Sequence, residues 1–277
     1  MNRVFVPPDA FLRSSFGTLP GSAPRLRVEG DLFHYLVKVL RLRPGDRFAA
    51  AAEGGPDRLC VIEEVDKHWL EARVEGERPP ASEAPVKVHL YQGWPKGDKL
   101  ELIIQKATEL GAVAITPVLT ERSVPRPAGQ GRIADKLARW QAVAREASEQ
   151  CGRAVIPAVS EPLTLPAAAA AMTVRGRPAF VLWEGEKTTG FLEALGKLGI
   201  PEGSRSPVAG CAGAEVALMV GPEGGLSPAE VSALVAAGVT PVSLGPRILR
   251  TETAAITAVA IVLERHGDLG RAFTPRD

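Results

Sequence analysis

The chain has 277 residues, 45% of them hydrophobic, which is enough to bury one large core or two modest ones. Its formal net charge is only +1, so the overall charge neither predicts nor excludes nucleic acid as a partner, and such a signal must be local. The three cysteines, Cys60, Cys151 and Cys211, are scattered with no histidine at ligand spacing, which predicts neither disulfides nor a bound metal. The opening "MNRVFVPPDAF" lacks a signal-peptide pattern, and no stretch approaches the ~20 apolar residues of a membrane span. We therefore expect a soluble cytoplasmic protein with no membrane partner.

Residues 1–75 predict a small, barrel-like β domain. Short β-like segments occupy residues 47–54 and 59–75, with turns at Gly54-Gly55 and near Asp66. One helix interrupts them between residues 30 and 48, because apolar residues recur there at helical spacing: Leu32, Leu36, Val39 and Leu40.

Residues 76–85, "GERPPASEAP", are rich in proline and small polar residues, which is typical of a linker. From residue 86 to residue 277 strands alternate with helices, and this order predicts an α/β domain with a largely parallel sheet. The predicted strands are residues 86–92, 113–119, 179–183, 216–220 and 240–244. The predicted helices lie within residues 96–111, 133–150 and 253–267, and the alanine run 167–171 is a further helix face.

Two of these helices carry signals for their ends or faces. Asp98 is a predicted N-cap, Glu101 can close a capping box with it, and Gly111 can end the helix. The long helix that follows is expected to turn one apolar face inward: Leu137, Trp140, Val143, Ala144 and Ala147.

Three predicted strands end in unusual loops, and in open α/β sheets ligands bind beyond the carboxyl ends of strands. The loop in "MVGPEGGLSPAEV" is followed by a strong helix start, with Ser227 as N-cap and Glu230 closing the box. It has neither a phosphate-loop lysine nor a dinucleotide glycine pattern, and Glu223 would repel phosphate. A neutral or cationic ligand fits better, because glycine lets a ligand approach bare backbone. The alternative is a tight turn that needs glycine for chain geometry alone.

A second loop, "LGPRILRTETAA", favours the ligand interpretation. Gly245 stands at a strand end, two arginines follow, and Thr251 or Thr253 can cap the next helix while backbone amides remain free for ligand oxygens. The alternative is an ordinary connection with a solvated arginine pair.

The pair "VGPEGGLSPAEV" and "LGPRILRTETAAITAVAIV" resembles the RsmE family of SPOUT-class methyltransferases. So do "HYLVKVLRLRPGDRF", "KGDKLELIIQKATELGAVAITPVLTERSV" and "RWQAVAREASEQCGRAVIP", in the family's order and over nearly the whole chain. The resemblance implies methylation of N3 of a uridine in 16S ribosomal RNA, with S-adenosylmethionine as cofactor and 16S rRNA or the small ribosomal subunit as partner. It also implies a PUA-like β-barrel followed by a trefoil-knotted SPOUT domain, and a homodimer formed through the knot. We accordingly expect residues 1–75 to be the RNA-binding barrel, 76–85 the linker and 86–277 the methyltransferase domain.

The resemblance also implies which residues bind the cofactor. They come from three loops: Leu182, Trp183, Glu184, Gly221, Pro222, Glu223, Gly224, Gly225, Leu244, Gly245, Ile248, Leu249, Arg250, Thr251, Glu252, Thr253 and Ala254. Within this set, Arg250 is the candidate for orienting the substrate or stabilising charge, and Glu252 is a candidate proton acceptor. Either residue could instead belong to a salt bridge between subunits.

RNA binding requires cations that face phosphate. The candidates are Lys38, Arg41, Arg43, Arg122, Arg139 and Arg153. Helical spacing puts His34, Lys38 and Arg41 on one side of the first helix, although His34 is expected to be half-buried packing. The seven-residue spacing of Arg139, Glu146 and Arg153 places these three on one helix face.

Three other functions are weighed against this one. The protein could be a SPOUT enzyme with another RNA target, a non-catalytic ribosome assembly factor, or a nucleotide-hydrolysing α/β protein. The intact cofactor motifs disfavour the second, and the missing phosphate-loop lysine disfavours the third.

Overall fold

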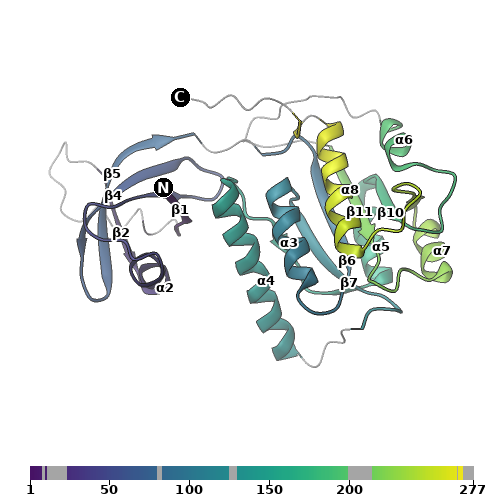
Figure 1. Cartoon of the computed structure of the whole chain (residues 1–277), viewed down its shortest axis with the longest axis horizontal. Helices are drawn as coiled ribbons and strands as arrows, with labels where there is room; N and C mark the ends of the chain where they lie inside the picture. The colour runs from purple at the N-terminus through teal and green to yellow at the C-terminus, as the bar shows by residue number, and fades with distance from the viewer. Residues whose placement is uncertain are drawn as a thin grey trace. The chain divides into compact units, whose positions relative to one another are not determined.

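The computed structural model describes residues 1–7, 10, 24–79, 83–124, 130–198, 214–266 and 268–270. The chain divides into two compact units, which are considered separately (Figure 1). Unit 1 comprises Met1–Ser82 and Glu149–Val155, and unit 2 comprises Glu83–Ser148 and Ile156–Pro275. The predicted linker overlaps the end of a strand that continues to Arg78, while its residues 80–82, like Cys211, lie outside the described residues.

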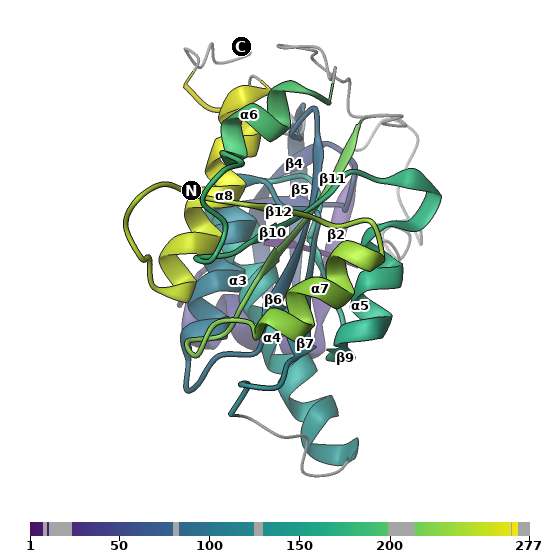
Figure 2. The ribbon, with the colours of Figure 1, turned by 90° about the vertical axis from the view of Figure 1, so that its right-hand side faces the viewer.

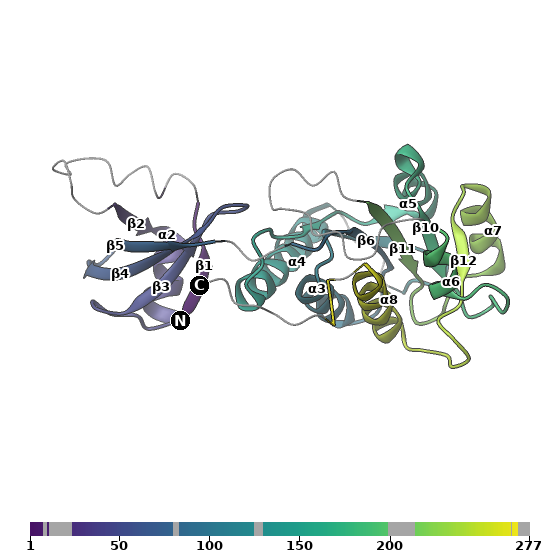
Figure 3. The same cartoon turned by 90° about the horizontal axis from the view of Figure 1, so that it is seen from above.

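Unit 1 is built on a five-stranded sheet of order β1-β3-β4-β5-β2, whose strands are labelled in Figure 3. Only β1 and β3 pair in parallel, and the other neighbours are antiparallel. The strands are β1 (Asn2–Phe5), β2 (Arg25–Glu29), β3 (Arg47–Ala51), β4 (Asp57–Val65) and β5 (Trp69–Arg78). Leu26, Phe48, Ile62 and Leu70 are fully buried between the sheet and the helix, so the expected small β domain with one helix is confirmed.

The helix of unit 1 differs in detail from its prediction. It begins as α2 (Gly30–His34) and continues as a π-helical turn (Tyr35–Val39), in which the Leu40 amide reaches back to the Tyr35 carbonyl at 2.9 Å. The wider turn rotates the following side chains relative to an α-helical pattern. Val39 is consequently 58% exposed, so its predicted place in the apolar stripe is wrong.

Two polar residues of this segment also lie elsewhere than predicted. His34 is exposed rather than half-buried, because Phe33 and Leu36 occupy the side that faces the core. Arg41 follows the end of the helix and has a φ of 58°, so it does not continue the side that carries His34 and Lys38. The basic residues 38–43 therefore lie on a helix end and a loop rather than on one helix face.

Unit 2 contains a sheet whose strand order is β12-β10-β11-β6-β7-β8, with β9 also pairing with β7. Every pairing is parallel, as the alternation of strands and helices predicts. The central strands are β6 (Lys87–Gly93), β11 (Glu215–Val220) and β10 (Ala179–Leu182). The others are β7 (Ala114–Leu119), β8 (Ala158–Val159), β9 (Leu163–Thr164) and β12 (Thr240–Val242).

Helices cover both faces of this sheet (Figure 2). One face packs against α3 (Lys99–Leu110), α4 (Gln130–Cys151), α6 (Phe191–Gly196) and α8 (Thr251–Arg265). The other packs against α5 (Leu165–Met172), which a short 3₁₀ turn (Val174–Gly176) follows, and α7 (Pro228–Ala236). Strand β6 serves both cores by alternation, with Leu90 in the first and Tyr91 in the second. The predicted inward face of α4 is confirmed: Trp140, Ala144 and Ala147 are buried, and Leu137 and Val143 pack beside them.

The helix termini follow the predictions only in part. Ser227 and Glu230 form the expected reciprocal capping box of α7, and Gly111 ends α3 with a φ of 121°. The capping box predicted for α3 is wrong, because Asp98 makes no side-chain cap bond and Glu101 accepts a 2.7 Å bond from Arg139 instead. Across the described residues, no helix is long and apolar enough to cross a membrane.

Candidate functional site

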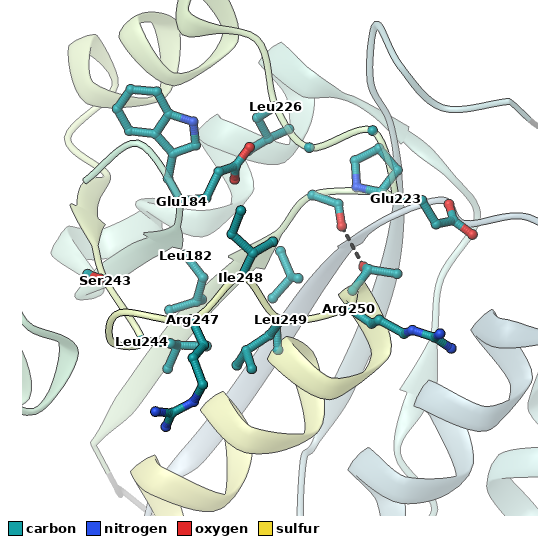
Figure 4. A pocket seen from close by; sticks show the side chains of 18 of the residues that line it. Leu182, Glu184, Glu223, Leu226, Ser243, Leu244, Arg247, Ile248, Leu249 and Arg250 are labelled. Carbon is teal, nitrogen blue, oxygen red and sulfur yellow. Dashed lines mark hydrogen bonds between the residues drawn. The ribbon is translucent and has the colours of Figure 1, made fainter. Parts of the chain in front are cut away.

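Three loops meet at the carboxyl edge of the sheet of unit 2. They follow β10, β11 and β12, and because these strands are parallel the loops emerge at the same edge. Together with the first turns of α3 and α8 they line an open cavity with a volume of about 520 Å³ (Figure 4). Small-molecule sites commonly occupy ~300–1,000 Å³ at such an edge.

All but two of the residues predicted to bind a cofactor line this cavity. Leu182, Trp183 and Glu184 come from the first loop, and Gly221 to Gly225 from the second. The third contributes Leu244, Gly245, Ile248, Leu249, Arg250, Thr251 and Ala254. Glu252 and Thr253 do not line it, because the start of α8 turns them away from the wall. Five lining residues were missed: Lys99, Val220, Leu226, Ser243 and Arg247.

A buried polar cluster joins two of these loops to β6. The Thr251 hydroxyl donates to the Gly221 carbonyl at 2.6 Å and accepts from Gln92 Nε2 at 2.8 Å. Gln92 is fully buried, and its Nε2 also lies 3.2 Å from the Gly221 carbonyl and 2.9 Å from the Gly93 carbonyl. The prediction that a threonine hydroxyl caps α8 is therefore wrong, since the N-cap is Arg250 and no side-chain cap bond is made. The hydroxyl fixes the turn after β11 instead.

The glycines of that turn are required by neighbouring protein atoms. A Cβ at Gly225, whose φ is 69°, would lie 2.5 Å from the Glu184 carboxylate, and one at Gly224 would lie 3.0 Å from Arg122 Cβ. Arg122 also donates to the Gly224 carbonyl at 2.8 Å. The geometry of the folded chain thus accounts for these two glycines, in agreement with the alternative interpretation of this loop as a tight turn. Gly245 differs, because with a φ of 116° it has no atom within 4 Å of its Cβ position.

Charges on three elements meet at one side of the cavity. Lys99, the first residue of α3, places its Nζ 3.0 Å from Glu223 Oε1 and 3.7 Å from Glu252 Oε2. Burial alone would raise the pKa of Glu223, but hydrogen bonds from its own backbone amide, from Lys99 and from the Lys96 amide outweigh burial and lower it. The charge of Glu223 is therefore already matched by a lysine.

The two predicted catalytic residues have contrasting surroundings. Arg250 is exposed, and among the described residues no hydrogen bond or ion pair involves its side chain. Figure 4 shows its guanidinium pointing away from that of Arg247. Glu252 Oε2 is buried and has no hydrogen-bond partner among the described residues. Only 15% of its side chain is exposed, and it does not line the cavity.

The first loop is held by its own carboxylate. Glu186 accepts hydrogen bonds from the Thr188 hydroxyl and amide, both at 2.6 Å, and from the Thr189 amide at 3.0 Å. The bonds from Thr188, and then that from Thr189, lower the pKa of Glu186 to about 2. The ionised carboxylate thus closes the turn that presents Trp183 and Glu184 to the cavity.

The cations predicted to contact RNA are distributed over both units. Lys38, Arg41 and Arg43 are exposed on unit 1. On unit 2, Arg122 supports the glycine turn and Arg139 pairs with Glu101 at 2.7 Å. The shared helix face predicted for Arg139 and Arg153 is wrong, because α4 ends at Cys151 and Arg153 lies beyond it. Only 7% of Arg153 is exposed, which leaves little of it for RNA. No cluster of three or more metal-ligating side chains occurs within the described part of the chain.

Comparison with known proteins identifies similar chains. A family model described as RNA methyltransferase domain matches residues 82–263, and one described as RNA methyltransferase PUA domain matches residues 28–75. Ribosomal RNA small subunit methyltransferase E of Bacillus subtilis is 34% identical over 87% of this chain and 90% of its own. Among solved structures, a putative methyltransferase from Legionella pneumophila with bound cofactor SAM has a TM-score of 0.75 at 29% identity, covering 94% of this chain and 96% of its own. Ribosomal RNA small subunit methyltransferase E of Neisseria gonorrhoeae, bound to S-adenosyl methionine, has a TM-score of 0.74 at 29% identity and covers 94% and 95%.

Substitution of Thr251 tests the buried cluster. Thr251→Val removes the hydroxyl but keeps the shape, so the free energy of unfolding should fall by about 1–3 kcal/mol because buried partners lose their bonds. Thr251→Ser keeps the hydroxyl and should stay within about 1 kcal/mol of the wild type. Urea unfolding measures both variants. A larger loss in Thr251→Ser than in Thr251→Val would show that the methyl group, not the hydroxyl, is what matters.

The Glu186 turn predicts a pH dependence. Because the folded-state pKa of about 2 lies below the ordinary 4.5, the turn is stabilised above pH 4.5 and loses this stabilisation as the pH falls towards 2. The amide NMR signals of Thr188 and Thr189 should therefore stay constant from pH 6 to about 4 and move only below that. In Glu186→Gln they should not titrate at all. A wild-type midpoint near 4.5 would show that these bonds do not hold the carboxylate.

Proposed function

Because the chain belongs to the RNA methyltransferase family whose model it matches at residues 82–263, we propose that it methylates N3 of a uridine in small-subunit ribosomal RNA, with S-adenosylmethionine as the methyl donor. The observation that carries this proposal is the cavity at the carboxyl edge of the sheet. It is lined by the three loops whose motifs resemble those of the family, and two similar solved structures are described as containing this cofactor.

The lining of the cavity suits S-adenosylmethionine. Leu182, Leu226, Leu244 and Leu249 offer apolar walls for a nucleoside, and the turn at residues 221–225 offers backbone polar groups. Glu184, whose carboxylate has no ion-pair partner among the described residues, lines it as well, which suits a ligand carrying ammonium and sulfonium charges better than a phosphate. When bound, the cofactor supplies an electrophilic methyl group.

Methylation at N3 sets modest chemical demands on the protein. The imide proton of uridine is mildly acidic, so no covalent nucleophile is required, and the protein contributes alignment and stabilisation of negative charge on the base. Arg250 suits this role, because its exposed guanidinium has no protein partner among the described residues at the edge of the cavity. Glu252 does not line the cavity, and water can take the proton instead.

Unit 1 supplies a surface for RNA phosphate. The arginines of its strands are largely paired with glutamates across the sheet: Arg25 and Arg73 with Glu63, Arg47 with Glu75, and Arg58 with Glu77. The side chains of Lys38, Arg41 and Arg43 form no such pair among the described residues and lie together at the end of the helix. We assign RNA contact to this basic segment, because unpaired cations release the most counterions from phosphate.

The remaining family expectations belong to the same proposal. They are a trefoil knot in the chain of unit 2, a homodimer formed through it, and a cytoplasmic location. Of the predicted RNA contacts beyond the basic segment of unit 1, we retain Arg122 and Arg139 of unit 2, which are exposed, and leave out Arg153, which is buried.

The first experiment identifies the product. Purified protein is incubated with S-adenosylmethionine and either free 16S ribosomal RNA or assembled small subunits, and nucleosides are quantified by mass spectrometry. We expect one 3-methyluridine per RNA. Methylation at another atom or base would indicate a different RNA specificity. RNA binding without any methylation would favour an assembly factor.

The second experiment tests the basic segment of unit 1. Arg41→Gln should weaken binding to the RNA and reduce the slope of log affinity against log salt by about 1, since one phosphate contact is lost. Arg47→Gln removes an equal charge that Glu75 already neutralises at 3.3 Å, and should leave the slope unchanged. Fluorescence anisotropy over a salt series gives both values. Equal effects of the two changes would show that RNA does not contact this segment specifically.

A further inference from the structure

Lys99 brings a positive charge to an unfavourable place. It is the first residue of α3, where the helix dipole favours anions and disfavours cations. Two carboxylates hold its ammonium group there: Glu223 at 3.0 Å from the glycine turn and Glu252 at 3.7 Å from the first turn of α8. The glycine turn and the first turn of α8 thus meet at this lysine of α3.

Lys99 belongs to the wall of the cavity, whereas Glu252 does not. Lys99 lines the cavity and its side chain is 36% exposed, but Glu252 is absent from the lining and its Oε2 is buried. The 3.7 Å separation from Glu252 Oε2 is too long for a hydrogen bond. Of the two carboxylates, the ammonium group of Lys99 therefore donates a hydrogen bond only to Glu223. Because an ammonium has three N–H donors, donors remain for a ligand.

We propose that Lys99 is a catalytic residue that donates a hydrogen bond to a carbonyl oxygen of the target uridine. The inference rests on the proposed methylation at N3. As N3 gives its proton to water, its lone pair forms the bond to the methyl carbon, and the electron pair of the carbon–sulfur bond stays on sulfur. Negative charge spreads onto the carbonyl oxygens beside N3 during this step, and Lys99 stabilises it there.

The two carboxylates position the lysine for this role. Glu223 fixes the ammonium by a direct bond, and the half-buried Glu252 attracts it without competing for a donor. Arg250, exposed at the edge of the same cavity, remains available to orient the RNA. This division of roles gives Glu252 a positioning role at a place where the sequence suggested a base.

The kinetic test uses Lys99→Met, which keeps the length of the side chain and removes its charge. With uridine RNA, kcat should fall about 100-fold, the usual cost of one donor to a developing oxyanion, while the affinity for S-adenosylmethionine measured by calorimetry stays within about threefold. RNA carrying 5-fluorouridine at the target has a more acidic imide and should restore the variant to within about tenfold of the wild type. Lys96→Met is the matched control: this exposed lysine, three positions earlier, does not line the cavity and should keep wild-type rates on both RNAs.

A second readout does not depend on turnover. The fluorine NMR signal of unmethylated 5-fluorouridine RNA, bound to the enzyme together with S-adenosylhomocysteine so that no methyl group is transferred, reports ionisation of the imide. Lys99 should lower the pKa of that imide relative to Lys99→Met, by up to about two units for a hundredfold effect.

The outcomes separate the two proposals. An equal loss of rate on uridine and 5-fluorouridine RNA, with the same imide pKa in both proteins, would show that Lys99 is only structural. Loss of cofactor binding in Lys99→Met would overturn the role proposed here as well. If the wild type makes no 3-methyluridine at all, the proposed function fails, and the role of Lys99 fails with it.

Discussion

The hydroxyl of Thr251 holds together the part of the molecule on which the site depends. It bonds the carbonyl of Gly221, and the buried amide of Gln92 reaches both residues from positions 159 and 129 residues away in the sequence. The end of β6, the turn after β11 and the start of α8 are thereby fixed to one another. Because the helix begins at this threonine, the same bond sets where the residues of the preceding loop, including Ile248 and Arg250, enter the cavity.

Around this buried cluster, most polar and glycine residues of the loops serve the protein itself. Gly224 and Gly225 make room for Arg122 and Glu184, and Glu223 neutralises Lys99. Such contacts keep the loops in place before any ligand arrives, and a preorganised site loses less free energy on binding. The groups left without a protein partner are then informative. Among the described residues, they include the exposed guanidinium groups of Arg247 and Arg250 and the unused donors of Lys99, all in the wall of the cavity.

Charge pairing shapes unit 1 in a comparable way. Arginines and glutamates alternate across β2, β4 and β5 and largely cancel, so the exposed sheet carries little net attraction for phosphate. The π-helical turn rotates Val39 outward and delivers Lys38 to the surface, and Arg41 follows in a left-handed backbone conformation. A chain with a net charge of +1 can therefore still present one concentrated basic segment.

The sequence alone determined the order of the longer strands and helices in unit 2, the inward face of α4 and the capping box at Ser227, because periodicity and capping are local properties. It also pointed to the three loops of the cavity, since glycine-rich strand ends are visible as motifs. It did not predict the short elements β8, β9 and α6. Tertiary structure decided the rest. Gln92 reads as an ordinary strand residue and Lys99 as a surface helix residue until contacts with residues far along the chain bring them to the loops, and Thr251 reads as a cap until Gly221 takes its hydroxyl. Residues that come into contact only after the sheet has formed show no periodic pattern in the sequence. The roles of Gln92, Lys99 and Thr251 could therefore not be predicted.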